Sequence, residues 1–116
     1  MRHLIHSLGY TGAVISPTFM LVQEYPVTLP NGGNVPLHHM DAYRIEDTSE
    51  CEEIGITDML QSGILCLEWP EICADWLPKD ALALTLELTD KHRQARIISP
   101  TRQDELETIE KAFHAR

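Results

Sequence analysis

A short apolar run, Ile64-Leu65-Cys66-Leu67, constrains the fold of this chain more than any other segment. The run contains no polar residue, Gly63 precedes it, and Glu68-Trp69-Pro70 follows it. An apolar run between such turn signals is typical of a strand whose two faces are both buried. A strand of this kind lies inside a sheet that is covered by helices, so the run predicts an α/β protein.

Periodicity and turn signals predict the elements on either side of this run. Helices are expected at residues 1–8, within 47–54, at 57–61, from 70 to about 76 and from 101 to 113, and strands at about 19–25, 35–43, 81–88 and 94–99, the first two joined by a turn at 29–34. Because strands and helices alternate only in part, we expect a mixed sheet.

Single residues add detail to two of these elements. Asp47 with Glu50, or Ser49 with Glu52, has the spacing of a capping box at the start of a short helix, which Gly55 then ends. In the strand at 81–88, leucines occupy every second position, which predicts one face in the core: Leu82, Leu84, Leu86 and Leu88.

Composition excludes several classes of protein. The chain has 116 residues and a formal charge of −9, which fits one domain and argues against broad adhesion to nucleic acid or anionic lipid. No apolar run is long enough for a membrane span, and the N-terminus lacks the pattern of a secretory signal. Three cysteines without a CxxC motif predict a reducing, cytoplasmic setting in which Cys51, Cys66 and Cys73 are buried or inert thiols.

Two acidic residues stand at the ends of predicted strands. Asp41 lies near the end of the strand at 35–43, and Glu68 directly follows the buried strand. Ligands of open α/β sheets bind outside the carboxyl ends of the strands, and two carboxylates there suit Mg²⁺ with its waters and substrate phosphates. The alternative is that both acids only face water or pair with Arg44, and spacing alone favours this alternative.

Other residues near these acids have a functional and a structural interpretation. Ser16-Pro17-Thr18 is either a turn into a strand or a hydroxyl-bearing loop that senses a phosphate. Trp69 either packs or shields a site from water. His38 and His39 point to opposite faces of a strand, so they are better interpreted as structural or surface histidines than as a metal cluster.

Four segments in order resemble the signature of the TsaE (YjeE) family, which consists of small bacterial P-loop ATPases for tRNA threonylcarbamoyladenosine (t6A) synthesis. Each motif is weak alone, but their order and spacing together form a specific signal over residues 1 to about 99. The segments are Ser16-Pro17-Thr18-Phe19-x-Leu21-Val22-x-Glu24-Tyr25, His39-x-Asp41-x-Tyr43-Arg44, Glu53-x-Gly55-Ile56-x-Asp58 and Leu67-Glu68-Trp69-Pro70.

The resemblance implies a three-layer α/β/α fold of the P-loop NTPase type with a mixed sheet, and a role for each matching residue. Asp41 matches the acid that holds Mg²⁺, and Glu68 matches an acid implicated in both metal binding and ATP hydrolysis. Ser16 and Thr18 match a switch-like loop near the γ-phosphate, with Trp69 beside the nucleotide. The implied cofactors are ATP and Mg²⁺, and the implied partners are the TsaD and TsaB proteins, with tRNA handled through the complex and no membrane.

The chain departs from the family at its start. The family begins with a strand and a GxxGxGKT loop, and these 116 residues contain no such loop. In P-loop enzymes that loop cradles the phosphates, and its Lys and Thr contact phosphate and Mg²⁺. We therefore expect a single TsaE-like domain over residues 1–116 that lacks its N-terminal strand and P-loop and is inactive as an ATPase by itself.

Three functions remain open at this point. The first is the ATPase component of the t6A complex, which cycles TsaB and TsaD. The second is a non-enzymatic interaction module, a truncated paralogue that contacts TsaD or TsaB without hydrolysing ATP. The third is a metal-dependent hydrolase that uses Asp41, Glu68 and a histidine.

Overall fold

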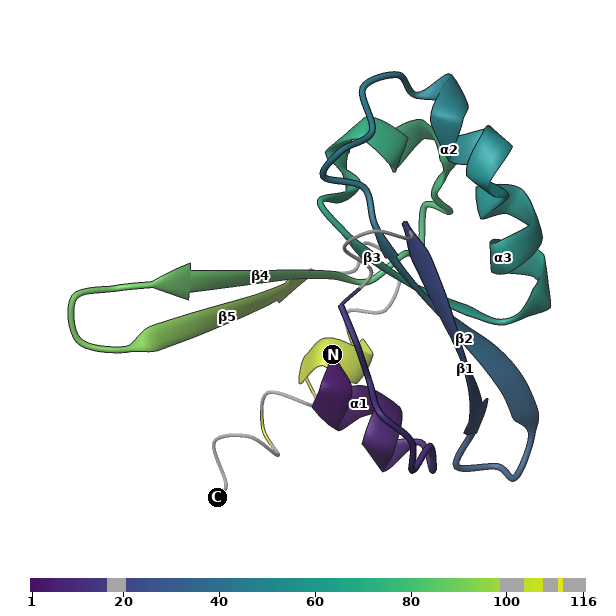
Figure 1. Cartoon of the computed structure of the whole chain (residues 1–116). Coiled ribbons are helices and arrows are strands. Elements are labelled where there is room, and N and C mark those ends of the chain that lie inside the picture. The colour runs from purple at the N-terminus through teal and green to yellow at the C-terminus, as the bar shows by residue number, and fades with distance from the viewer. Residues whose placement is uncertain (17–20, 99–103, 108–110, 112–116) are drawn as a thin grey trace. The chain divides into compact units, whose positions relative to one another are not determined.

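The computed structural model describes residues 1–16, 21–98, 104–107 and 111 (Figure 1). Contacts divide the chain into two compact units, Met1–Trp76 and Leu77–Arg116. The single domain expected over residues 1–116 stays a prediction.

The first unit is built on a sheet of three strands. Its strands are β1 (Val22–Thr28), β2 (Asn34–Asp41) and β3 (Ile64–Glu68), in the order β1-β2-β3. β1 and β2 are antiparallel, whereas β2 and β3 are parallel, so the predicted mixed sheet is confirmed. β1 extends beyond the predicted strand at 19–25 to Thr28, and the turn at 29–34 joins it to β2 as expected.

One buried hydrophobic cluster of this unit lies between the first helix and the hairpin. Helix α1 (Arg2–Ser7) confirms the helix predicted at 1–8. Its Ile5 is fully buried together with Tyr25 and Val27 of β1 and Leu37 of β2. Ile5 thus packs this helix of less than two turns against the sheet. Such packing is needed because isolated short helices are unstable.

Two helices connect β2 to β3. They are α2 (Ser49–Ile54) and α3 (Ile56–Ser62), and Gly55 between them has a φ of 98° that favours glycine. The capping-box prediction was wrong. Thr48 is the N-cap without a side-chain bond, and Asp47 instead accepts hydrogen bonds from the backbone N–H and the hydroxyl of Ser49, both at 2.9 Å. These bonds lower the pKa of the exposed Asp47 carboxyl, because they favour its charged form.

After β3 the chain forms a 3₁₀ helix, η1 (Pro70–Trp76), where a short helix was predicted. Cys73 of η1 is bridged to Cys51 of α2 by a disulfide. The prediction of three unbridged thiols was therefore wrong for this pair and right for Cys66. The two cysteines are 22 residues apart in sequence, so their proximity arises from the fold and left no sequence signal.

The second unit contains a hairpin of β4 (Ala83–Leu88) and β5 (Arg93–Ile98), which pair antiparallel as a separate sheet. The prediction that the leucine face lies in the core was wrong. All four leucines of that face are exposed, Leu86 by 75%: Leu82, Leu84, Leu86 and Leu88. In a two-stranded sheet each strand has only one neighbouring strand. The alternation of apolar and polar residues along a strand shows which face is apolar, but it does not show whether another layer covers that face. Residues 104–107 are helical, within the predicted C-terminal helix. In the part of the chain that the structure describes, no helix is long and apolar enough to cross a membrane.

Candidate functional site

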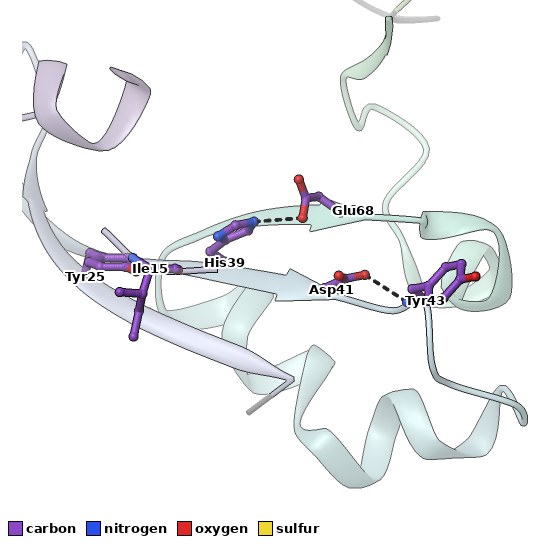
Figure 2. A network of polar contacts seen from close by, with 6 residues as sticks. All are labelled: Ile15, Tyr25, His39, Asp41, Tyr43 and Glu68. Atoms are coloured by element: carbon purple, nitrogen blue, oxygen red, sulfur yellow. Dashed lines mark hydrogen bonds and ion pairs between the residues drawn. The ribbon is translucent and has the colours of Figure 1, made fainter. Parts of the chain in front are cut away.

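The two predicted metal-binding acids lie side by side at the carboxyl ends of β2 and β3 (Figure 2). The parallel register pairs Asp41 directly with Glu68. The backbone N–H of Ala42 also donates to the carbonyl of Glu68 at 3.0 Å, so the pairing continues to the last residue of β3. The sheet therefore places Asp41 and Glu68 at adjacent register positions, although 26 residues lie between them in sequence.

Asp41 is held by the backbone that follows it. One of its carboxylate oxygens, Oδ1, accepts a hydrogen bond from the N–H of Tyr43 at 2.9 Å, and the side chain is partly buried. Among the described residues, neither Asp41 nor Glu68 forms an ion pair with Arg44, so the alternative that Arg44 neutralises them has no support here. The second oxygen of Asp41 remains available as a ligand.

Glu68 faces a buried histidine. The Nε2 atom of His39 lies 3.2 Å from Oε2 of Glu68, and the Glu68 side chain is 50% exposed while that of His39 is 5% exposed. Neither ring nitrogen of His39 has a hydrogen bond of favourable geometry, so the contact is a close approach that becomes an ion pair only when the ring is protonated. The sequence favoured a structural or surface role for His39 and did not predict its contact with Glu68, and only its position two residues before Asp41 in the motif could have drawn attention to it.

His38 has the structural role that was expected. Its Nε2 atom lies 3.1 Å from the hydroxyl of Ser62 in α3, on the other face of β2. The two adjacent histidines thus point to opposite faces, as strand geometry requires. His38 attaches α3 to the sheet, and His39 belongs to the carboxylate site.

An exposed aromatic pair adjoins the acids. The rings of Tyr43 and Trp69 lie 5.2 Å apart between centroids, and the residues are 68% and 59% exposed. Trp69 has a φ of 55°, in the left-handed region that is unfavourable for a residue with a bulky side chain. Tyr43 was missed as a site residue, although it stands two positions after Asp41 in the motif.

The loop that carries Ser16 is attached to β1 through a tyrosine. The hydroxyl of Tyr25 accepts a bond from the N–H of Ile15 at 3.1 Å and donates to its carbonyl at 3.2 Å (Figure 2). Ser16 is exposed next to this anchor. Thr18 lies outside the described residues, so its predicted proximity to the acids stays a prediction.

The donors present fit magnesium. Mg²⁺ typically takes one or two carboxylates and completes its shell with water and phosphate oxygens, and Asp41 and Glu68 supply two neighbouring carboxylates. No group of three or more His, Cys, Asp or Glu side chains suited to a metal occurs among the residues that the structure describes.

Comparison with known proteins gives the same family for a family model and for curated relatives. The model of the family "Threonylcarbamoyl adenosine biosynthesis protein TsaE" matches residues 1–98. The tRNA threonylcarbamoyladenosine biosynthesis protein TsaE of Bacillus subtilis is 38% identical over 81 residues, which are 69% of this chain and 47% of that protein. The protein of the same name from Haemophilus influenzae is 33% identical over 101 residues, 86% of this chain and 61% of that protein.

A solved structure shows the same fold. The crystal structure of Bacillus subtilis YdiB superposes with a TM-score of 0.66 at 23% identity, covering 99% of this chain and 68% of that one. The mixed α/β fold predicted from the sequence is thereby confirmed. This chain spans about half the length of the curated relatives that it matches, 47% and 61% in the two cases above. Since the family model covers residues 1–98 of the 116, the chain belongs to the TsaE family of threonylcarbamoyl adenosine biosynthesis proteins.

Proposed function

We propose that this chain carries the metal-binding half of an ATPase site that serves t6A modification of tRNA in the cytoplasm. The observation that supports the proposal most directly is the direct register pairing of Asp41 with Glu68 at the carboxyl ends of two parallel strands. In α/β proteins that edge is where nucleotides and their metal ions bind.

Each residue of the site has a proposed role. Asp41 and Glu68 would hold Mg²⁺, which when bound neutralises charge on the nucleotide phosphates. Glu68 would also be the catalytic residue, because its carboxylate is half exposed and can reach a water as well as a metal. Trp69, together with Tyr43, would cover the nucleotide from the solvent side. Ser16 and Thr18 would approach the phosphates from the preceding loop.

Phosphate binding requires parts that these residues do not contain. A nucleoside triphosphate carries about three to four negative charges at neutral pH. The chain that would bind it has a formal charge of −9 itself. The sequence has no GxxGxGKT loop to donate N–H groups and a lysine. We therefore propose that ATP binding, and with it the cycling of the TsaB and TsaD partners, needs a phosphate-binding loop in addition to residues 1–116.

Calorimetry tests this proposal. Residues 1–116 should show little or no heat of binding with ATP and Mg²⁺, and binding should appear once a segment with a GxxGxGKT loop is joined upstream of Met1. In the joined protein, D41N and E68Q should each weaken the Mg²⁺-dependent part of binding about tenfold or more, which corresponds to about 1.4 kcal/mol. The matched control is E24Q, which changes an exposed carboxylate on β1.

Tight ATP binding by residues 1–116 alone would overturn the need for the loop. Mg²⁺-dependent binding that D41N and E68Q leave intact would overturn the assignment of the metal ligands.

The interaction module is the second candidate, and the exposed Tyr43–Trp69 pair favours it, because exposed aromatic pairs are frequent anchors of protein interfaces. Residues 1–116 would then bind TsaD or TsaB without nucleotide, and Y43A with W69A would reduce that binding. Retention of the partners by the double variant at unchanged affinity would remove this candidate's support.

A further inference from the structure

The disulfide links the chain segment that follows Asp41 to the chain segment that follows Glu68. Cys51 is in α2, on the connection that follows Asp41, and Cys73 is in η1, which begins two residues after Glu68. Their Cα atoms are 6.0 Å apart, and both side chains are fully buried. The bridge therefore joins the continuation of β2 to the continuation of β3 just beyond the site.

Few other contacts hold η1 in this place. Cys73 is its one buried residue, and the rest of the helix is exposed or partly exposed. Trp76 at its end donates from Nε1 to the carbonyl and the hydroxyl of Thr48, at 3.0 and 3.2 Å. A 3₁₀ helix has weaker internal hydrogen bonds than an α-helix, so an η1 without the bridge is expected to open locally.

We propose that the Cys51–Cys73 bridge is a reversible redox clasp that holds the Glu68–Trp69 turn. With the bridge closed, the backbone on both sides of η1 is fixed. With the bridge open, the hydrogen bonds from Trp76 to Thr48 remain, but η1, which begins directly after the left-handed residue Trp69, has lost its covalent attachment to α2. This inference stands independently of the proposed ATPase function, because it concerns the order of the turn and not the ligand.

The chemistry of the clasp is thiol–disulfide exchange with a low-molecular-weight disulfide such as oxidised glutathione. One protein thiolate attacks a sulfur of the small disulfide, forming a mixed disulfide and releasing one small thiolate. The second protein thiolate then attacks the bridged protein sulfur, which closes Cys51–Cys73 and releases the second small thiolate. The protein loses two electrons and two protons in total, and the small disulfide becomes two thiols.

The burial of both sulfur atoms makes exchange depend on opening of η1. A reagent reaches fully buried sulfurs only in molecules whose local structure has opened. Cys66, the free cysteine on β3, supplies an internal comparison. It is partly buried, and burial raises the pKa of its thiol, which disfavours the thiolate that exchange requires.

The experiment equilibrates the whole chain in buffers of graded reduced-to-oxidised glutathione ratio, blocks free thiols with N-ethylmaleimide, and measures peptide masses and amide hydrogen exchange. At the oxidising end, the peptides of Cys51 and Cys73 should be linked and Cys66 unlinked. At the reducing end, exchange at residues 69–76 should quicken about tenfold or more, and by a larger factor than exchange in β1 and β2.

Two variants serve as controls. C66S should respond to the glutathione ratio as the wild type does, and C51S/C73S should exchange rapidly at residues 69–76 at every ratio. If the double variant does not fold, the wild type and C66S in both redox states still decide the question. Labelled Cys51 and Cys73 at the oxidising end would overturn the clasp. So would linkage without a change at residues 69–76, or quickening by an equal factor there and in β1 and β2.

Discussion

Trp69 is the one non-glycine residue with a positive φ in the part of the chain that the structure describes. Its φ of 55° is in the left-handed region, where a Cβ atom approaches the following carbonyl. Such conformations persist only when surrounding structure enforces them, and they concentrate at functional sites. Here the backbone bond from Ala42 to Glu68 and the start of η1 enclose the turn on both sides.

Comparing two substitutions separates the cost of this backbone from the loss of the indole. W69A and W69G both remove the ring and its contact with Tyr43, but only alanine retains a Cβ atom. W69G should therefore be more stable than W69A by about 1 kcal/mol, even though glycine normally destabilises the folded chain through the entropy of the unfolded state. Urea unfolding of the two variants measures the difference, and W69A as the more stable of the two would contradict it.

Cys66 provides a prediction in pH. Burial raises the pKa of its thiol above the ordinary value of 9.0, because desolvation disfavours the thiolate. The folded chain thus holds this proton more tightly than the unfolded chain does. The associated stability is fully present below pH 9.0 and declines as the pH rises through the folded pKa.

Alkylation of Cys66 measures this shift. In the native chain, the rate should continue to increase with pH above the midpoint that the same residue shows in denaturant, since only the thiolate reacts. Iodoacetamide labelling followed by mass spectrometry gives both rates on one peptide. A native midpoint at or below the denatured one would show that the thiol is not desolvated.

At the scale of elements, Gly63 sets the distance between the start of β3 and β2. A Cβ atom placed on Gly63 would clash with the carbonyl oxygen of Pro36, which is backbone and cannot move aside as a side chain can. G63A should therefore destabilise the chain by about 1–3 kcal/mol through forced displacement of the strands.

Gly33 is the matched control for this substitution. A Cβ atom there meets only the Asn31 side-chain oxygen, at 3.1 Å, in the exposed turn between β1 and β2. G33A should change stability little, and thermal unfolding of the two variants gives the comparison. Equal melting temperatures for G63A and G33A would show that the strands can separate at Gly63 without cost.

At the scale of the whole molecule, local patterns predicted more of the fold than of the site. The apolar run at 64–67 and the stop at Gly55 are local signals, and the strand and the helix end both lie where they were expected. The burial predicted for both faces of that strand was wrong, because β3 is at the edge of the three-stranded sheet and its apolar residues are only partly buried. Asp41 and Glu68 could be paired because strand ends meet at one edge. The close approach of His39 to Glu68 and the bridge between Cys51 and Cys73 depend on register and on helix placement, which no local pattern encodes.

The charge of the whole chain gives the last prediction. Nine basic residues against eighteen acidic ones leave a formal charge of −9, although the family acts in tRNA modification. Affinity for nucleic acid comes largely from lysine and arginine side chains, which neutralise phosphates and release their counterions. In this chain such side chains are outnumbered by acidic ones. We therefore expect residues 1–116 alone to bind tRNA with a Kd above roughly 10⁻⁴ M at physiological salt, which is the weak end of non-specific binding. Fluorescence anisotropy of labelled tRNA, repeated over a salt series, measures this. Any binding at low salt should vanish as salt is raised, whereas micromolar binding that persists at physiological salt would show a local cationic surface that the net charge conceals.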